Sequence, residues 1–121
     1  MLFRSLFVYG TLQRGAKNHR HLAGQRFIAP ARTTPGFQLR DMGGYPGIVA
    51  DPDGPEGVTG EVWAVDAAAL RRLDQFEGVD HGLYRRAPIA LADKFADQQV
   101  EAYFPVQPIT GPSLGTTWRE A

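Results

Sequence analysis

The chain contains no cysteine. This absence excludes a disulfide framework, a thiolate nucleophile and any metal site with thiolate ligands. Its 13 basic and 13 acidic side chains give a formal net charge of zero, so there is no excess positive charge to attract a phosphate backbone, and we expect no nucleic-acid partner. The sequence also lacks a targeting segment and any apolar run of membrane-spanning length. We therefore expect a cytoplasmic protein without a membrane partner.

The residues that are present favour one strand-rich domain. A length of 121 residues falls within the usual range of a single domain, here 1–121, and a hydrophobic content of 43% is sufficient for a core. The 14 glycines and 9 prolines are scattered along the chain, as expected when many short strands are joined by tight turns.

Candidate strands are short segments rich in β-branched and aromatic residues between turn formers. Val58–Val65 is the clearest and is expected to be a central strand, whereas Pro88 places its strand at an edge or a bulge. A short helix is expected near Lys17–Leu22, and the tail Pro108–Ala121 is expected to be irregular. The candidate strands are Leu2–Tyr9, Gln25–Thr33, Gly36–Asp41, a short piece around Ile48 and Val49, Val58–Val65, Tyr84–Leu91 and Gln99–Val106.

One α-helix is well signalled. Asp66 is a suitable N-cap residue, Ala67–Ala69 are strong helix formers, and Leu70 and Leu73 begin an apolar stripe. Gly78 is placed to end the helix. The helix is therefore expected to begin after Asp66 and to end at Gly78.

Glu77 is the catalytic candidate. It follows Leu73 by four residues and Leu70 by seven, so its carboxyl group is expected on the same face of the helix, toward the core. Apolar surroundings and the negative end of the helix dipole both predict a raised pKa, and a carboxyl group that titrates closer to neutrality suits general acid/base catalysis. Spacing alone also fits a solvated glutamate at the end of the helix, and this alternative stays open.

A second candidate site follows the first predicted strand, at Tyr9, Gly10, Thr11 and Leu12. A glycine here lets the backbone turn tightly, so that successive N–H groups can point toward one carboxylate or oxyanion. We therefore take these four residues as candidates for substrate binding. An ordinary glycine turn at the end of a strand is the alternative interpretation.

Several motifs, taken together and in this order, carry more information than each one separately: Phe7–Leu12, Gly44–Gly47, Gly60–Trp63, Leu73–Gly78 and Tyr84–Arg86. In this combination the chain resembles the gamma-glutamylcyclotransferase-like family, from about Phe7 to Tyr103. Leu12 makes the loop similar to the gamma-glutamylamine cyclotransferase (AIG2-like) branch. The resemblance implies an α+β fold, with a small mixed β-barrel of about six strands and flanking helices. It also implies a pocket in which Tyr9–Leu12 face Glu77.

The resemblance further implies a reaction without metal or cofactor, on a small-molecule gamma-glutamyl substrate. The substrate's α-amino group attacks its own γ-carbonyl, and 5-oxoproline and a free amine are released, with Glu77 as acid/base. Tyr9, Tyr84 and Tyr103 are candidates for the wall of the pocket or for hydrogen bonds to the substrate, and a place in the core is the alternative for each. The segments 79–83 and 115–118 depart from the usual pattern of the branch, which leaves the side of the departing amine undefined. A hydrolytic amidase and a non-catalytic binding module are the alternatives.

The three histidines do not predict a metal site. No carboxylate or third ligand stands at a familiar spacing beside His19 and His21, and His81 is far along the chain. We interpret all three as surface residues. Gly111–Thr116 contains glycines and hydroxyl groups but lacks the lysine of a phosphate-binding loop, and is interpreted as a turn.

Overall fold

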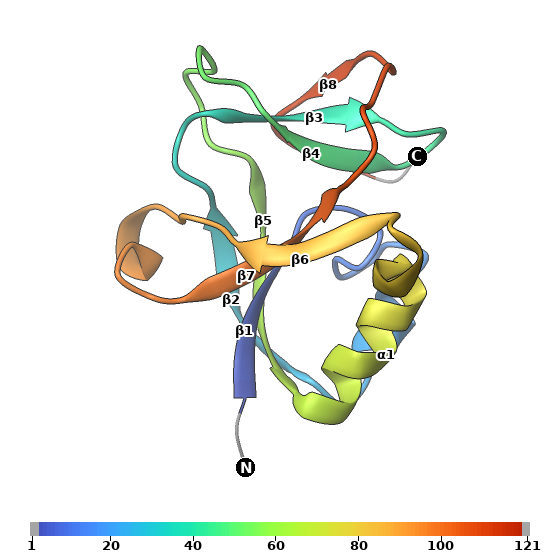
Figure 1. The fold of residues 1–121 in the computed structure, drawn as a ribbon. Helices are drawn as coiled ribbons and strands as arrows, with labels where there is room; N and C mark the ends of the chain where they lie inside the picture. Colours follow the sequence, from blue (N-terminus) through green and yellow to red (C-terminus); the bar gives the residue numbers. More distant parts are fainter. Residues whose placement is uncertain (1–2, 120–121) are drawn as a thin grey trace.

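The computed structural model describes residues 3–119, so the predicted strand start at Leu2 and the last two residues of the tail lie outside it. The described chain contains eight strands, one α-helix and three short 3₁₀ helices (η). In chain order these are β1 (Phe3–Val8), η1 (His19–Leu22), β2 (Arg26–Arg32), β3 (Phe37–Asp41), β4 (Pro46–Ala50), β5 (Thr59–Asp66), α1 (Ala67–Glu77), η2 (Val79–His81), β6 (Tyr84–Pro88), η3 (Asp93–Phe95), β7 (Val100–Pro105) and β8 (Ser113–Gly115) (Figure 1).

The strands form two sheets, with the smaller sheet above the larger one in Figure 1. The larger sheet has the order β2-β5-β1-β7-β6, and the smaller one has the order β4-β3-β8. β1 pairs antiparallel with β5 and parallel with β7, so the larger sheet is mixed. The α+β class is confirmed, as are the central position of β5 and the edge position of β6, which ends at Pro88.

A closed barrel is not confirmed, because neither sheet closes on itself within residues 3–119. The edge strands β2 and β6 are not paired with each other, and the chain joins them only through the last residue of β2 and the residues that follow the two strands. There the N–H of Ala92 donates to the carbonyl of Arg32 at 2.9 Å, and the N–H of Thr34 donates to the carbonyl of Ala90 at 3.0 Å. Pro30 in β2 and Pro88 in β6 lack an N–H group, which limits ladder pairing along both edges.

The tail differs from its prediction. β8 lies within the segment expected to be irregular, and within the segment 111–116 interpreted as a turn, yet it pairs with β3. Two further bonds hold this part of the chain to the small sheet: Arg40 Nε donates to the carbonyl of Gly111 at 2.8 Å, and the N–H of Asp41 donates to the carbonyl of Pro112 at 2.9 Å. A three-residue strand is too short for an alternating pattern, so only its distant partner reveals it.

α1 begins and ends as predicted. Asp66 Oδ1 accepts a hydrogen bond of 2.8 Å from the N–H of Ala69, and Gly78 ends the helix in the left-handed conformation, with φ at 71°. Leu70 and Leu73 are buried, as their spacing indicates. The short helix expected at 17–22 is the 3₁₀ helix η1. Of the helices that the structure describes, none has the length and apolarity that crossing a bilayer requires.

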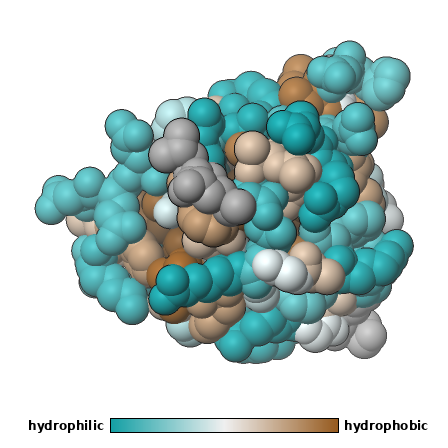
Figure 2. All heavy atoms as spheres, turned by 90° about the horizontal axis from the view of Figure 1, so that it is seen from below, coloured by the Kyte–Doolittle hydropathy of each residue, from teal (hydrophilic) through white to brown (hydrophobic). Residues whose placement is uncertain are grey.

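β5 is buried on both of its faces, which divides the core into two clusters. Trp63 and Val65 pack with residues of α1, whereas Val62 packs with Leu39 and Ile48 of the small sheet. α1 therefore covers one face of the large sheet, and the small sheet covers the other. Figure 2 shows the molecule from below, where hydrophilic residues predominate and apolar residues appear in patches between them.

The N-cap of α1 gives a first prediction. Replacing Asp66 by alanine is expected to lower the free energy of unfolding by about 1 kcal/mol, because the N–H of Ala69 loses its acceptor at the start of the helix. Urea denaturation would measure this change, with Asp53→Ala in an exposed loop as the control, for which the change should stay within about 0.5 kcal/mol. Equal losses in the two variants would contradict the capping role.

Candidate active site

A cavity of about 290 Å³ lies where five segments meet. These segments are the end of β1 with the loop after it, the first residues of β4, the last turn of α1, the start of β6, and the middle of β7. Glu77 and Tyr9–Leu12 all line it, so the structure brings together the residues that the sequence analysis selected. The volume is at the small end of the range of ligand pockets, about 300–1,000 Å³, which suits a ligand the size of an amino-acid derivative.

Glu77 is partly buried in this cavity, which rules out the alternative of a solvated helix end. Burial raises the pKa of its carboxyl group from 4.5 to about 7. Within residues 3–119 no hydrogen bond or ion pair reaches the carboxylate, so no protein group offsets the loss of hydration. The group is therefore close to half-protonated at neutral pH, where it can both accept and donate a proton.

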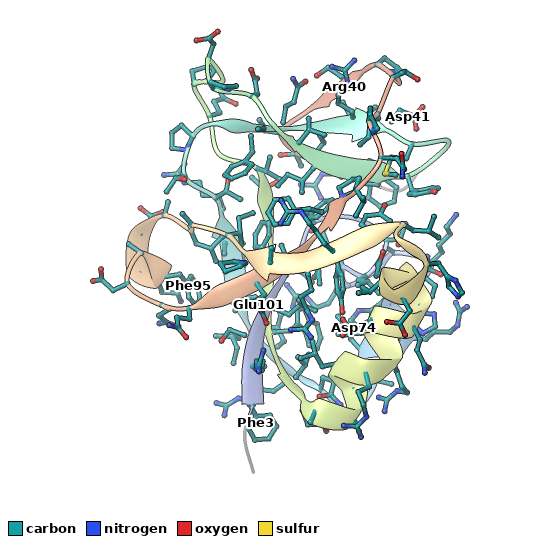
Figure 3. All side chains as sticks on the ribbon, in the orientation of Figure 1. Phe3, Arg40, Asp41, Asp74, Phe95 and Glu101 are labelled. Atoms are coloured by element: carbon teal, nitrogen blue, oxygen red, sulfur yellow. The ribbon has the colours of Figure 1, made fainter. Side chains whose placement is uncertain are left out.

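Asp74, one turn earlier on α1, has the opposite environment. Figure 3 shows it on the side of the helix that faces the large sheet. Arg86 binds both of its oxygens, at 2.9 and 3.0 Å, and Tyr103 donates to it at 2.6 Å. Burial alone would raise the pKa of Asp74, but these hydrogen bonds lower it below its usual value. Two carboxyl groups on one helix thus have pKa values shifted in opposite directions, a pattern typical of acid/base sites.

The N–H groups of Gly10, Thr11 and Leu12 make no hydrogen bond to a protein acceptor in the part of the chain that the structure describes. The three residues line the cavity, so their N–H groups are candidates to bind an anionic or carbonyl oxygen there. Glycine is required at position 10 for a close approach and not for a positive φ. A Cβ atom there would lie 2.8 Å from Cγ of Pro46.

The loop is held in place from outside the cavity. Asn18 donates to the carbonyl and to the hydroxyl of Thr11, both at 3.0 Å, and His19 Nδ1 donates to the carbonyl of Leu12 at 2.9 Å. Glu61, which is buried, accepts from the N–H of Arg14 at 3.1 Å and from its Nε at 3.2 Å. None of these roles was predicted from the sequence. The signal in the sequence was Glu61, a charged residue within the strand that was predicted to be central.

The histidines differ from their interpretation as surface residues, except for His81, which is exposed. His19 and His21 are half-buried: the ring of His19 lies 5.1 Å from that of Trp63, and the ring of His21 lies 4.1 Å from that of Phe76, between centroids. Each packs against an aromatic ring next to the site. Among residues 3–119, no three His, Asp or Glu side chains lie close enough together to hold a metal ion.

The tyrosines of the cavity are fixed by the fold. The hydroxyl of Tyr9 donates to the carbonyl of Tyr103 at 2.8 Å and accepts from the N–H of Ile48 at 3.3 Å, so Tyr9 presents its ring to the cavity while its hydroxyl joins the two sheets. Tyr84 and Tyr103 also line the cavity. Burial, first of all, raises the pKa of both hydroxyl groups, which therefore stay protonated near neutral pH.

Comparisons with known proteins agree with this site. A gamma-glutamylaminecyclotransferase of Homo sapiens is 41% identical over 88 residues, which are 67% of this chain and 57% of the human protein. A gamma-L-glutamyl-butirosin B gamma-glutamyl cyclotransferase of Niallia circulans is 32% identical over 73 residues, which are 60% of this chain and 45% of that protein. The chain thus spans about half the length of these curated relatives.

The fold leads to the same group of proteins. The crystal structure of an AIG2-like protein from Mus musculus superposes with a TM-score of 0.81 at 25% identity, over 98% of this chain and 90% of the mouse chain. Residues 6–120 match the family described as gamma-glutamyl cyclotransferase, AIG2-like. Since this match covers nearly the whole chain and includes every residue of the candidate site, the chain belongs to the AIG2-like gamma-glutamyl cyclotransferase family.

Proposed function

We propose that the protein is a cyclotransferase that converts gamma-glutamyl amines into 5-oxoproline and free amines. One observation carries the proposal. Glu77, whose pKa burial raises to about 7, has no hydrogen-bond or ion-pair partner among residues 3–119, and it lines the same cavity as Gly10–Leu12, whose N–H groups have no acceptor among those residues. The relative from Homo sapiens, named for gamma-glutamylamines, supports the substrate class.

The reaction needs no nucleophile from the protein. The α-amino nitrogen of the substrate attacks its own γ-carbonyl carbon, and the new C–N bond closes a five-membered lactam. Holding the glutamyl group in a folded conformation provides most of what such an intramolecular attack requires. The chain's lack of cysteine is therefore compatible with this chemistry.

Glu77 moves the proton. Its carboxylate accepts a proton from the attacking amine, and the resulting carboxylic acid donates that proton to the departing nitrogen as the original C–N bond breaks. The negative charge that develops on the γ-carbonyl oxygen is stabilised by one or more N–H groups of Gly10, Thr11 and Leu12, and the others hold the substrate. The products are 5-oxoproline and the amine, and Glu77 returns to its starting state.

Product analysis with two substrates tests the proposal. We expect the protein to convert a gamma-glutamyl amide into 5-oxoproline, detected by mass spectrometry. It should leave the α-N-acetylated form of the same amide intact, because the acetyl group blocks the attacking nitrogen. A hydrolytic amidase would release free glutamate and would also cut the acetylated amide. Binding of both amides without any product would instead indicate a binding module.

A further inference from the structure

Large apolar side chains that are exposed to solvent lie at the mouth of the cavity. Tyr45, Phe76 and Leu83 line the cavity, yet 38%, 42% and 56% of their surfaces remain exposed. They come from three separate segments: the residue before β4, the last turn of α1 and the residue before β6. Apolar surface gathered at a cavity, unlike isolated apolar residues on a surface, marks an area that a ligand covers.

These side chains flank the reacting groups. Phe76 precedes Glu77, and Gly78 follows it. Leu83 packs against Gly78, because a Cβ atom added at Gly78 would lie 2.7 Å from Leu83 Cδ1. Tyr45 precedes Pro46, which lies against Gly10 of the loop. If the loop binds the gamma-glutamyl group and Glu77 reaches the scissile nitrogen, the substituent on that nitrogen would lie beside these three side chains.

The mouth offers little to a positively charged substituent. The charged side chains among the described lining residues are Lys17 and Glu77, so the only carboxylate there is the one assigned to proton transfer. The ring of His21 packs against the ring of Phe76. Nε2 of His21 is buried and has no hydrogen-bond partner in residues 3–119. Burial, together with Arg20 and Arg72, lowers the pKa of His21, so the ring behind Phe76 is neutral at neutral pH.

We propose that the mouth formed by Tyr45, Phe76 and Leu83 binds an uncharged, apolar substituent of the departing amine. The preferred substrates are then gamma-glutamyl amides of aliphatic or aromatic amines, and amides whose departing amine carries a second ammonium group are poor substrates. This inference rests on the proposed function and names the substrate class of the same site. The reaction itself is unchanged: the lactam C–N bond forms, the amide C–N bond breaks, and the apolar amine leaves with the proton from Glu77.

Two amides of matched length test the preference, the gamma-glutamyl amide of pentylamine and that of putrescine. Their chains have the same number of heavy atoms, and only the terminal methyl and ammonium groups differ. We expect kcat/KM, measured as 5-oxoproline formation, to be at least about tenfold higher for the pentylamide, because the mouth covers its apolar chain. Equal values, or a preference for the putrescine amide, would overturn the inference while leaving the cyclotransferase function intact.

A pair of variants locates the preference. Leu83→Asn is expected to reduce the pentylamide-to-putrescine ratio of kcat/KM at least about fivefold, since it replaces the most exposed apolar residue of the mouth. Ile28→Asn is the matched control: Ile28 is 40% exposed on β2, away from the cavity, and the ratio should not change. Equal effects of the two substitutions would contradict a role for the mouth.

Binding to the Glu77→Gln protein separates failure of the inference from failure of the proposed function. If no amide yields 5-oxoproline, the proposed function is wrong. Calorimetric titration of the Glu77→Gln protein with the two amides then tests the apolar mouth by itself. A dissociation constant at least about tenfold lower for the pentylamide supports the mouth, and equal constants refute it.

Discussion

The Glu77→Gln variant is expected to lose 5-oxoproline formation by about 10³-fold, the middle of the range for removal of a general acid/base. Glutamine keeps the shape of the side chain but cannot exchange a proton with the substrate. In the unsubstituted protein, kcat/KM should fall as pH decreases through about 7, because protonated Glu77 cannot accept the proton of the attacking amine. The variant's residual activity should lack this dependence on Glu77.

The same substitution is expected to stabilise the fold at neutral and alkaline pH. The pKa of Glu77 is raised from 4.5 in the unfolded chain to about 7 in the folded protein, so the folded state holds the proton more tightly. The folded protein therefore loses stability as pH rises from about 4.5 through 7, and glutamine, which carries no charge, does not. Since one pKa unit corresponds to about 1.4 kcal/mol, the variant should be more stable by about 3 kcal/mol above pH 7.

Urea denaturation at pH 4 and pH 8 would measure this difference. The two proteins should be equally stable at pH 4, where Glu77 is protonated in both states, and should differ at pH 8. Glu56→Gln is the matched control, because Glu56 is exposed and the change in stability should stay within about 0.5 kcal/mol at both pH values. A loss of activity without any gain in stability at pH 8 would mean that Glu77 does not titrate as its burial indicates.

Local features of the sequence were sufficient to predict the helix that carries Glu77. The N-cap at Asp66, the stop at Gly78 and the stripe of Leu70 and Leu73 all lie within one helix, so α1 could be predicted to the residue. The same periodicity predicted Glu77 on the apolar face of α1, but spacing alone also fitted a solvated side chain, and only the folded structure distinguishes the two. Periodicity does not predict that Glu77 lies in one cavity with the loop after β1, because that arrangement depends on the pairing of distant strands. Only the resemblance to a family predicted it.

The groups that hold the site in place were missed because their partners are distant in the sequence. Glu61 and Arg14 meet because β5 pairs with β1, and β8 forms only because β3 offers it an edge. The expected barrel was not confirmed for a related reason. A list of strands does not state which edges meet, and here β2 and β6 remain separate edges.

A network of charged side chains joins α1 to the large sheet, and its loss gives the second large prediction. Arg86 on β6 binds Asp74 through two hydrogen bonds and Glu101 on β7 through a third, of 2.7 Å. The three side chains are 21–26% exposed, so they are mostly shielded from water. Figure 3 shows the two acids on separate elements, Asp74 on α1 and Glu101 on β7.

Replacing Arg86 by methionine is expected to lower the free energy of unfolding by about 3 kcal/mol, because it leaves the partly buried Asp74 without a cation and leaves Glu101 with the exposed Arg4, at 3.2 Å, as its remaining cation. Arg85→Met is the matched control. Arg85 is the next residue of β6 but is exposed, and its guanidinium lies 5.0 Å from the centre of the Phe104 ring, so the loss should be below about 1 kcal/mol. Urea denaturation at pH 7 distinguishes the two, and equal losses would contradict the role of the network.

The pH dependence of this effect separates it from simple loss of packing. The folded-state pKa of Asp74 lies below its usual value of 3.8, so the stability gained from its contact with Arg86 is present above about pH 4 and is lost as pH falls through the folded-state pKa. The difference between the unsubstituted protein and Arg86→Met should therefore shrink in acid, whereas the difference caused by Glu77→Gln grows toward alkaline pH. Because the two carboxyl groups stand one turn apart on α1, these opposite dependences test the separate environments from which the acid/base role of Glu77 was inferred.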